Sequence, residues 1–551
     1  MRFFVVPVHR GLSLRRQVYP TNPYRLHWEM TAMKRIAMHW LGVLLGVLVV
    51  VMGAGAAHAQ KDTLVIALNQ DPDIIDPTLS RTYVGRIIYA NMCEKLYDID
   101  ENLNIFPQLA ADFPAFSNGG KTVTIRLRKG VRFNDGTPMN AEAVKFSLER
   151  HRDFPGSNRK SELKQITKVE ALGEDTVRIT LSEPFTPIVG AFVDRSGMPV
   201  SPAQARKLGD KFGTAPICVG PWTLTERVSQ DHITLEKSKY YFDPSQAHFN
   251  KLVFRIITDD SVRLANLRSG DIDLMHLVGP TDAASLKKEG KFQVVGVTGM
   301  GYQGVTINIH NKTGKHEPPG DLGTPLANDP RVREALELSI DRDALNQVAW
   351  DGQYTPGCTP LSPVSPFFDK SQTCTKRDVA KAKQLLAAAG VTGAYKFELM
   401  TVNNPQQQRV AEIIQGMARE AGFDISLRPM EFAAGLKDYD AGKYQAFLIG
   451  WSGRVDPDAN IYQFHACGGS LNQANVCDKD IDALLDKARQ SSDNAERKKL
   501  YSEAIQAFTK GRRNIIYLYH LNYIVAFPKN LNGYKATPDG LIRLKGVSWQ
   551  P

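Results

Sequence analysis

The sequence predicts an α/β protein with two or three lobes. At 551 residues the chain is longer than a single hydrophobic core normally organises. Strand patterns dominate its first half, and its second half alternates strand-like runs with helical patterns. The composition, 42% hydrophobic and 23% charged, is typical of a globular protein.

Several strands are expected in the first half. Residues 63–68 form a short apolar run of the kind found in buried strands, and apolar and polar residues alternate over 123–128. Two further strands are predicted within 169–181, joined by a turn at 173–175. Asn140 is placed to cap a helix that follows it.

The second half predicts βαβ units. Helix starts are indicated at Asp329-Pro330, at Thr375 with Asp378, and at Asn404-Pro405. Strand-like runs alternate with these helices at 397–402, 425–430 and 446–451. A second α/β lobe is therefore expected over about 305–512. The strand-like run 515–519 is expected to rejoin the first lobe.

The first 59 residues have the features of an export signal. A basic segment at 33–35 precedes an apolar run at 40–52, and Ala57-His58-Ala59 supplies small residues for signal peptidase. We expect cleavage after Ala59 and a periplasmic protein. An uncleaved anchor is the alternative, which the short apolar run disfavours. Residues 1–32 are interpreted as an upstream extension.

The net charge does not indicate nucleic-acid binding. Residues 1–59 contain seven Lys or Arg and one acidic residue, so most of the formal charge of +10 belongs to the export segment. The remainder shows no basic stripe interleaved with aromatic residues. No nucleic-acid partner is expected.

All six cysteines lie beyond the signal, which indicates disulfides in an exported protein. Sequence alone permits 15 pairings among six cysteines. Short separations within loop-like segments favour Cys358 with Cys374 and Cys467 with Cys477, leaving Cys93 with Cys218. A zinc site is the alternative, but no pair has CxxC spacing.

Motifs for catalysis or cofactor binding are scarce. The GxGxxG pattern at 299–304 is followed by a strand-like run and not by the helix that a dinucleotide site requires. The chain contains no HExxH and no GxSxG motif. We therefore expect no enzyme, no cofactor and no metal site, with an exported hydrolase as the least favoured alternative.

The segment 450–460, GWSGRVDPDAN, is the first candidate for ligand binding. It directly follows an apolar strand, and ligands of open α/β sheets gather beyond the carboxyl ends of strands. Trp451 offers a flat wall, Gly453 allows close backbone approach, and Arg454 offers a planar fork for a carboxylate or phosphate. The alternative is a plain surface loop.

From about residue 62 to its end, the chain resembles the bacterial extracellular solute-binding proteins of family 5, the peptide, nickel and opine receptors of ABC importers. The motifs that carry the resemblance occur in the family's order. They are PQLAAD at 107–112, LRKGVRFNDG at 127–136, AEAVKFSL at 141–148, GPW at 220–222, RLANLRSGDID at 263–273, VREAL at 332–336 and IDR at 340–342. Asn140 and Ala143 depart from the family pattern.

The resemblance implies a two-lobed periplasmic-binding-protein clamp with mixed sheets and an α+β subdomain inserted in the first lobe. Ligand would be buried between the lobes, with hinge crossings near 305–309 and 512. The expected division is 1–32 extension, 33–59 signal, 60–93 lobe I, 94–212 inserted subdomain, 213–304 lobe I, 305–512 lobe II and 513–551 lobe I. The expected partners are a small-molecule ligand and ABC permease subunits, and the protein is expected to be a monomer.

The same resemblance makes Arg454 unusual. Peptide-binding members carry an Asp at this place, which pairs with the ligand's ammonium group. The segment where a dipeptide-binding member has a carboxylate-binding Arg reads Thr401-Val-Asn403 here. One hypothesis is that Arg454 binds an anionic group of the ligand. The other is that Arg454 pairs with Asp456 or Asp458 and braces its own loop.

Further ligand-binding candidates follow from the family's contact regions. Together with the loop candidates, the predicted site residues are Thr82, Tyr83, Tyr302, Gln303, Asn403, Trp451, Ser452, Gly453, Arg454 and Asp456. The function expected from the resemblance is that of an importer receptor for a peptide, an opine or a related amino-acid derivative, anionic ones included. A receptor for a metal chelate and a receptor that serves only a sensor remain alternatives.

Overall fold

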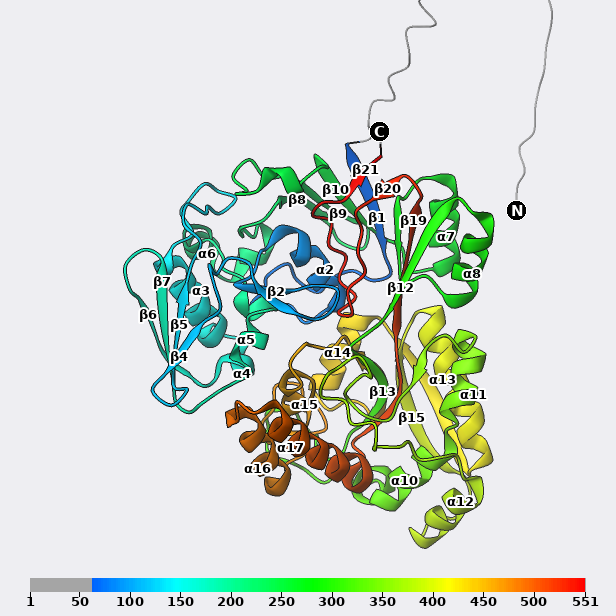
Figure 1. The fold of residues 1–551 in the computed structure, drawn as a ribbon. Coiled ribbons are helices and arrows are strands. Elements are labelled where there is room, and N and C mark those ends of the chain that lie inside the picture. Colours follow the sequence, from blue (N-terminus) through cyan, green and yellow to red (C-terminus); the bar gives the residue numbers. More distant parts are fainter. Residues whose placement is uncertain (1–61, 551) are drawn as a thin grey trace, which may run out of the picture. The chain divides into compact units, whose positions relative to one another are not determined.

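The computed structural model describes residues 62–550, so the predictions for the export segment lie outside the described residues. A seven-stranded mixed sheet forms the core of the first lobe (Figure 1). Its strands, in spatial order, are β12 (Phe292–Thr298), β19 (Asn522–Pro528), β11 (Leu274–His276), β1 (Thr63–Leu68), β10 (Lys251–Ile256), β9 (His232–Lys237) and β8 (Trp222–Val228). Its helices are α2 (Tyr83–Met92), α7 (Asp260–Ser269) and α8 (Pro280–Glu289).

A six-stranded mixed sheet forms the core of the second lobe. Its strands, in spatial order, are β14 (Thr355–Pro356), β18 (Ile515–His520), β13 (Tyr302–Ile307), β17 (Ala446–Trp451), β15 (Tyr395–Val402) and β16 (Phe423–Met430). Its helices are α9 (Pro325–Asn328), α10 (Pro330–Ser339), α11 (Arg342–Trp350), α12 (Val379–Ala388), α13 (Pro405–Glu420), α14 (Phe432–Asp440), α15 (Asp458–His465), α16 (Lys479–Gln490) and α17 (Asn494–Gln506). The parallel pairing of β15 with β16 across α13 is the predicted βαβ unit.

A smaller α+β subdomain is inserted between α2 and β8. It contains a four-stranded sheet, in the order β4 (Ala115–Ser117), β5 (Thr122–Arg126), β7 (Thr176–Leu181) and β6 (Ile166–Ala171). Its helices are α3 (Ala141–Asp153), α4 (Lys160–Leu163), α5 (Ile188–Ala191) and α6 (Pro202–Leu208). A hydrophobic core of its own, including Val123, Ile125 and Phe133, supports this sheet.

Several local signals form the elements that the sequence predicts. Asn140, Asp329 and Asn404 each accept a backbone N–H at the start of a helix, as N-cap residues do. The helix expected from Thr375 begins later, because Asp378 caps α12. Short pairings complete the described chain, between β2 (Tyr97–Ile99) and β3 (Ile105–Pro107) and between β20 (Leu531–Asn532) and β21 (Ser548–Trp549).

The crossings between the two large sheets lie a few residues from their expected positions. The chain enters the second sheet at β13, from Tyr302, and leaves it after β18, which ends at His520. The prediction that 515–519 rejoins the first lobe is therefore wrong. Every residue of β18 is buried, and the strand pairs antiparallel with β13, so β19 is the strand that returns to the first sheet.

Three disulfides join the six cysteines in the predicted pairs. They are Cys93–Cys218, Cys358–Cys374 and Cys467–Cys477. The Cα atoms of Cys93 and Cys218 lie 5.0 Å apart, although 125 positions separate the residues along the chain. This disulfide therefore closes the loop that contains the inserted subdomain. Within the described chain, no helix is long and apolar enough to cross a membrane.

Candidate functional site

The loop that follows β17 lies at the meeting of the two lobes. Trp451 ends the strand, and its indole N–H donates to Asn460 Oδ1 at 2.9 Å. Gly453 has φ +78°, and an added Cβ would come within 2.6 Å of the Met300 backbone. A side chain at this position would be strained and would clash with the hinge segment. Glycine thus lets the loop pack directly against the chain between the lobes.

Arg454 pairs with neither of its expected loop partners. Its Nε contacts Asp194, a carboxylate of the inserted subdomain, and both side chains are only 6% exposed. The same carboxylate lies 3.2 Å from Arg86 Nε and 3.7 Å from Arg195 Nε. Burial acts to raise the pKa of Asp194, but the surrounding arginines outweigh it and hold this pKa well below its ordinary value.

The two acidic residues of the loop have other cations as partners. Asp456 receives two hydrogen bonds from Arg497 Nη2, at 2.8 and 2.9 Å. Asp458 lies 3.0 Å from Arg489 Nε. The hypothesis that either acid neutralises Arg454 is therefore wrong, because both carboxylates are engaged by helices α16 and α17 of the second lobe.

A pocket lies beside Trp451, between the second sheet and the loop that precedes α2. Most of its wall is aromatic or aliphatic, and Arg81 is the charged residue among those that line it within the described chain. Its lining residues are Arg81, Tyr302, Thr306, Phe432, Leu436, Tyr439, Ile449, Gly450, Trp451, Phe464, Leu471 and Gln473. The cavity volume is about 70 Å³, enough for a few water molecules. In this arrangement the pocket has no room for a larger solute.

Arg81 links the lobes at the edge of this pocket. Its guanidinium contacts both carboxylate oxygens of Asp440, at the end of α14 in the second lobe. Asp440 is shared with Lys315 Nζ at 3.2 Å and with Gln473 Nε2 at 3.1 Å. Burial acts to raise the pKa of Asp440, but Arg81 and Lys315 outweigh it and lower this pKa below its ordinary value.

The other predicted residues have varied surroundings. Thr82 caps α2, and the Tyr83 hydroxyl donates to the Gly540 carbonyl in the first lobe. Ser452 Oγ accepts from Arg86 Nη1 at 3.1 Å, across the lobes. Gln303 donates to Gln407 Oε1 at 2.9 Å, whereas Asn403 is exposed after β15. Among the ten predicted residues, Tyr302 and Trp451 line the pocket.

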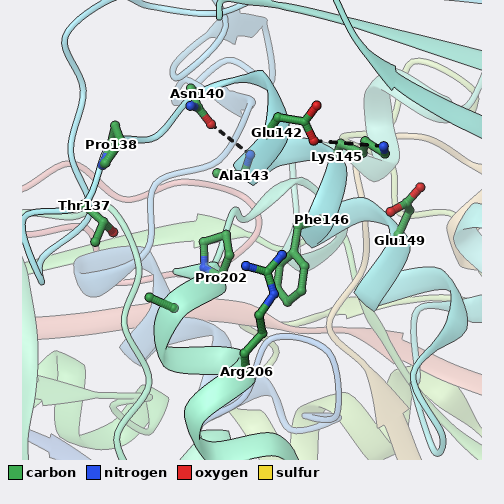
Figure 2. A pocket seen from close by; sticks show the side chains of 11 residues that line it. Thr137, Pro138, Asn140, Glu142, Ala143, Lys145, Phe146, Glu149, Pro202 and Arg206 are labelled. Carbon is green, nitrogen blue, oxygen red and sulfur yellow. Dashed lines mark hydrogen bonds and ion pairs between the residues drawn. The ribbon is translucent and has the colours of Figure 1, made fainter.

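A second depression lies on the inserted subdomain, between α3 and α6 (Figure 2). Glu142, Lys145 and Glu149 line one side, and the guanidinium of Arg206 lies 4.9 Å from the ring centroid of Phe146. None of the ten predicted site residues lines it. Its lining belongs to one subdomain, so it lacks the two-lobed character of the pocket beside Trp451.

Two sheet-based lobes that meet over an aromatic pocket define the class of two-lobed periplasmic binding proteins. Residues 104–472 match the bacterial extracellular solute-binding proteins, family 5. The chain belongs to this family and is a solute-binding protein. The predicted family and fold class are thereby confirmed.

Individual relatives agree with this assignment. The glutathione-binding protein GsiB of Escherichia coli (strain K12) is 28% identical over 517 residues, covering 91% of this chain and 97% of the relative. The structure of AgaA from A. tumefaciens R10 in complex with agropinic acid has a TM-score of 0.79 at 25% identity, covering 89% of this chain and 99% of that chain. DppA from Helicobacter pylori, in complex with the peptide STSA, has a TM-score of 0.81 at 25% identity with the same coverage.

Sequence reasoning missed the residues that carry charge between the lobes. Arg81, Asp440 and Asp194 come from three separate segments, and none belongs to a motif or a local spacing pattern. Arg81 adjoins the predicted pair Thr82 and Tyr83, so the loop was identified without its charged member. Asp194 carries no sequence signal, because its partners Arg86 and Arg454 are distant along the chain and meet it only in the fold.

Proposed function

We propose that this protein is exported to the periplasm, captures a small organic solute in the pocket beside Trp451, and delivers it unaltered to the permease of an ABC importer. The main support for this proposal is the pocket wall, which combines Arg81 of the first lobe with residues of β13, β17 and α14 of the second lobe. A solute that touches both lobes favours the closed arrangement, because its binding energy depends on both walls being present.

The relatives support an amino-acid derivative as the solute. GsiB is named for glutathione, AgaA was solved with agropinic acid, and DppA was solved with a short peptide. The Arg454–Asp194 pair argues against the usual peptide arrangement, in which a free carboxylate at the position of Arg454 receives the ligand's ammonium group. We therefore favour an opine-like or otherwise modified amino-acid derivative over an ordinary dipeptide.

Thermal unfolding of the exported protein tests this function. The protein would be unfolded and refolded with its disulfides intact, to remove bound solute, and then screened with peptides, opines, glutathione and nickel chelates. A solute at a hundredfold excess over its Kd stabilises the folded state by about 2.7 kcal/mol. We expect Trp451→Ala to remove the resulting shift in Tm. Phe116→Ala is the matched control, because Phe116 is 48% exposed on β4.

Uptake by intact cells tests delivery separately. Deleting the gene should abolish accumulation of the solute that stabilises the purified protein, and the solute recovered from the protein should be chemically unchanged. Normal uptake in the deletion strain would contradict the role in import. A hydrolysed solute would show instead that the protein is an enzyme.

A further inference from the structure

The interface between the lobes holds two groups of charged side chains, and each has more cations than carboxylates. In the first group Arg86, Arg195 and Arg454 share the single carboxylate of Asp194. The neighbouring Arg159 has a carboxylate of its own, because its Nη1 donates to Glu162 at 2.7 Å. Three guanidinium groups thus share one carboxylate at ion-pair distance, while Asp539 acts on Arg86 and Glu162 acts on Arg454 from farther away.

The second group borders the pocket. Arg81 and Lys315 share Asp440, and their side chains are only 16% and 10% exposed. Excess positive charge in a part-buried site is unfavourable unless an anion compensates it. The second group is thus short of one negative charge at the edge of the pocket beside Trp451.

Arg81 is the cation that a solute can reach. It lines the pocket, whereas Lys315 and Asp440 do not. Its backbone is held in place, because Arg81 N donates to Asp73 Oδ2 at 2.7 Å. If Arg81 turns toward a solute, Asp440 keeps Lys315 at 3.2 Å and Gln473 at 3.1 Å. The exchange therefore leaves no buried carboxylate without a partner.

Resting on the function proposed above, we propose that the solute is an organic anion with an apolar body, and that its carboxylate binds Arg81. The planar guanidinium can donate two parallel hydrogen bonds to a carboxylate. The remaining wall offers Tyr302, Trp451 and Phe464 to the apolar part. The anion subsite thus lies on the first lobe, at Arg81, and not at Arg454 as the sequence suggested.

Matched probes test this assignment. N-acetyl-phenylalanine is an anion, N-acetyl-phenylalaninamide is its neutral counterpart of nearly the same size, and phenylalaninamide is a cation. Titration calorimetry with the exported, refolded protein should show that the anion binds about 10- to 100-fold more tightly than either amide. Arg81→Gln should remove this preference, and Arg81→Lys should keep part of it because the charge remains.

Arg206→Gln is the control, because this arginine lies in the depression of Figure 2, outside the pocket. It should bind all three probes as the unmodified protein does. Equal affinity for the anion and its amide would overturn the anion assignment, as would a preference that survives in Arg81→Gln or an absence of binding by every probe. If the neutral amide bound as tightly as the anion and Trp451→Ala abolished the binding of both, the anion assignment would be overturned while the solute-binding pocket would stand. Failure of the proposed function would appear independently, as unimpaired uptake in the deletion strain.

Discussion

At the scale of single residues, Asp194 and Arg454 are not equivalent members of their ion pair. Asp194 is the one carboxylate that Arg86, Arg195 and Arg454 share, whereas loss of Arg454 leaves Asp194 with two guanidinium partners. Removing one partner of a buried ion pair is costly chiefly because it leaves the other charge uncompensated. The cost should therefore depend strongly on which partner is removed.

Asp194→Asn is expected to lower the free energy of unfolding by about 3–5 kcal/mol, because it leaves buried guanidinium groups without a carboxylate. Arg454→Met should cost less than about 2 kcal/mol, since it relieves repulsion between cations. Urea unfolding followed by circular dichroism measures both values. Equal losses in the two variants would contradict the shared-carboxylate arrangement.

Site residues that local sequence patterns mark could be predicted, whereas ion pairs between distant segments could not. Trp451 was predicted from the end of a strand and Tyr302 from a family contact region, and both line the pocket. The partner of Arg454 was assigned wrongly, because only neighbouring acids such as Asp456 are visible in a linear sequence. Long-range pairs such as Arg454 with Asp194 are set by the packing of the inserted subdomain against the second lobe.

At the scale of elements, a hydrogen bond connects the end of β18 to the segment before β13, where the chain passes between the two sheets. The Nδ1 of His520, the last residue of β18, lies 2.8 Å from the Gly301 carbonyl, so it donates in the neutral ring. Burial lowers the pKa of His520 to about 4, and the hydrogen bond to Gly301 only partly opposes this shift. The folded state therefore favours neutral His520, whereas the unfolded chain takes up a proton below about pH 6.5.

This histidine should make stability depend on pH in one direction. The folded pKa lies below the unfolded one, so the contribution is complete above about pH 6.5 and is lost as pH falls toward 4. His520→Asn should keep a donor toward Gly301 without titrating. Relative to the unmodified protein, the variant should gain about 2 kcal/mol between pH 7 and pH 5. Urea unfolding at both values measures the change, and parallel pH profiles would contradict it.

Elements with local signals were the most predictable. Asn140, Asp329 and Asn404 cap helices that the sequence predicts, because capping depends on residues within one turn. The sheet membership of β18 was not predictable in this way. An all-buried strand has the same apolar pattern in either sheet, and its pairing with β13 depends on the whole second lobe.

At the scale of the whole molecule, the disulfides should contribute unequally to stability. Loop-closure entropy assigns about 5 kcal/mol to a bridge that closes 125 residues and about 3 kcal/mol to one that closes 10. We expect the double variant Cys93→Ser/Cys218→Ser to lose more stability than Cys467→Ser/Cys477→Ser. Chemical denaturation of the two purified proteins measures the order, and the reverse order would contradict the entropic account.

The general architecture was predictable from the family motifs, because they occur in order along most of the chain. The lobe boundaries were less predictable than the architecture. The second sheet begins at Tyr302 and ends at His520, whereas the sequence predicted boundaries at 305 and 512. Charge at the lobe interface was not predictable at all. It depends on Arg81 and Asp440, which meet only when both lobes are folded and in contact.

The disulfide between Cys93 and Cys218 bears on how solute-binding proteins of this kind can exchange the inserted subdomain. Their Cα atoms lie 5.0 Å apart, so the inserted subdomain is a module that the chain enters and leaves at one narrow neck. Met198, Val200 and Phe212 of this module pack in the core of the first lobe. The module carries Asp194, the counterion of Arg454. Recombination at this neck would therefore exchange the counterion of Arg454 in one step, whereas Arg81 lies outside the module and would stay with the recipient chain.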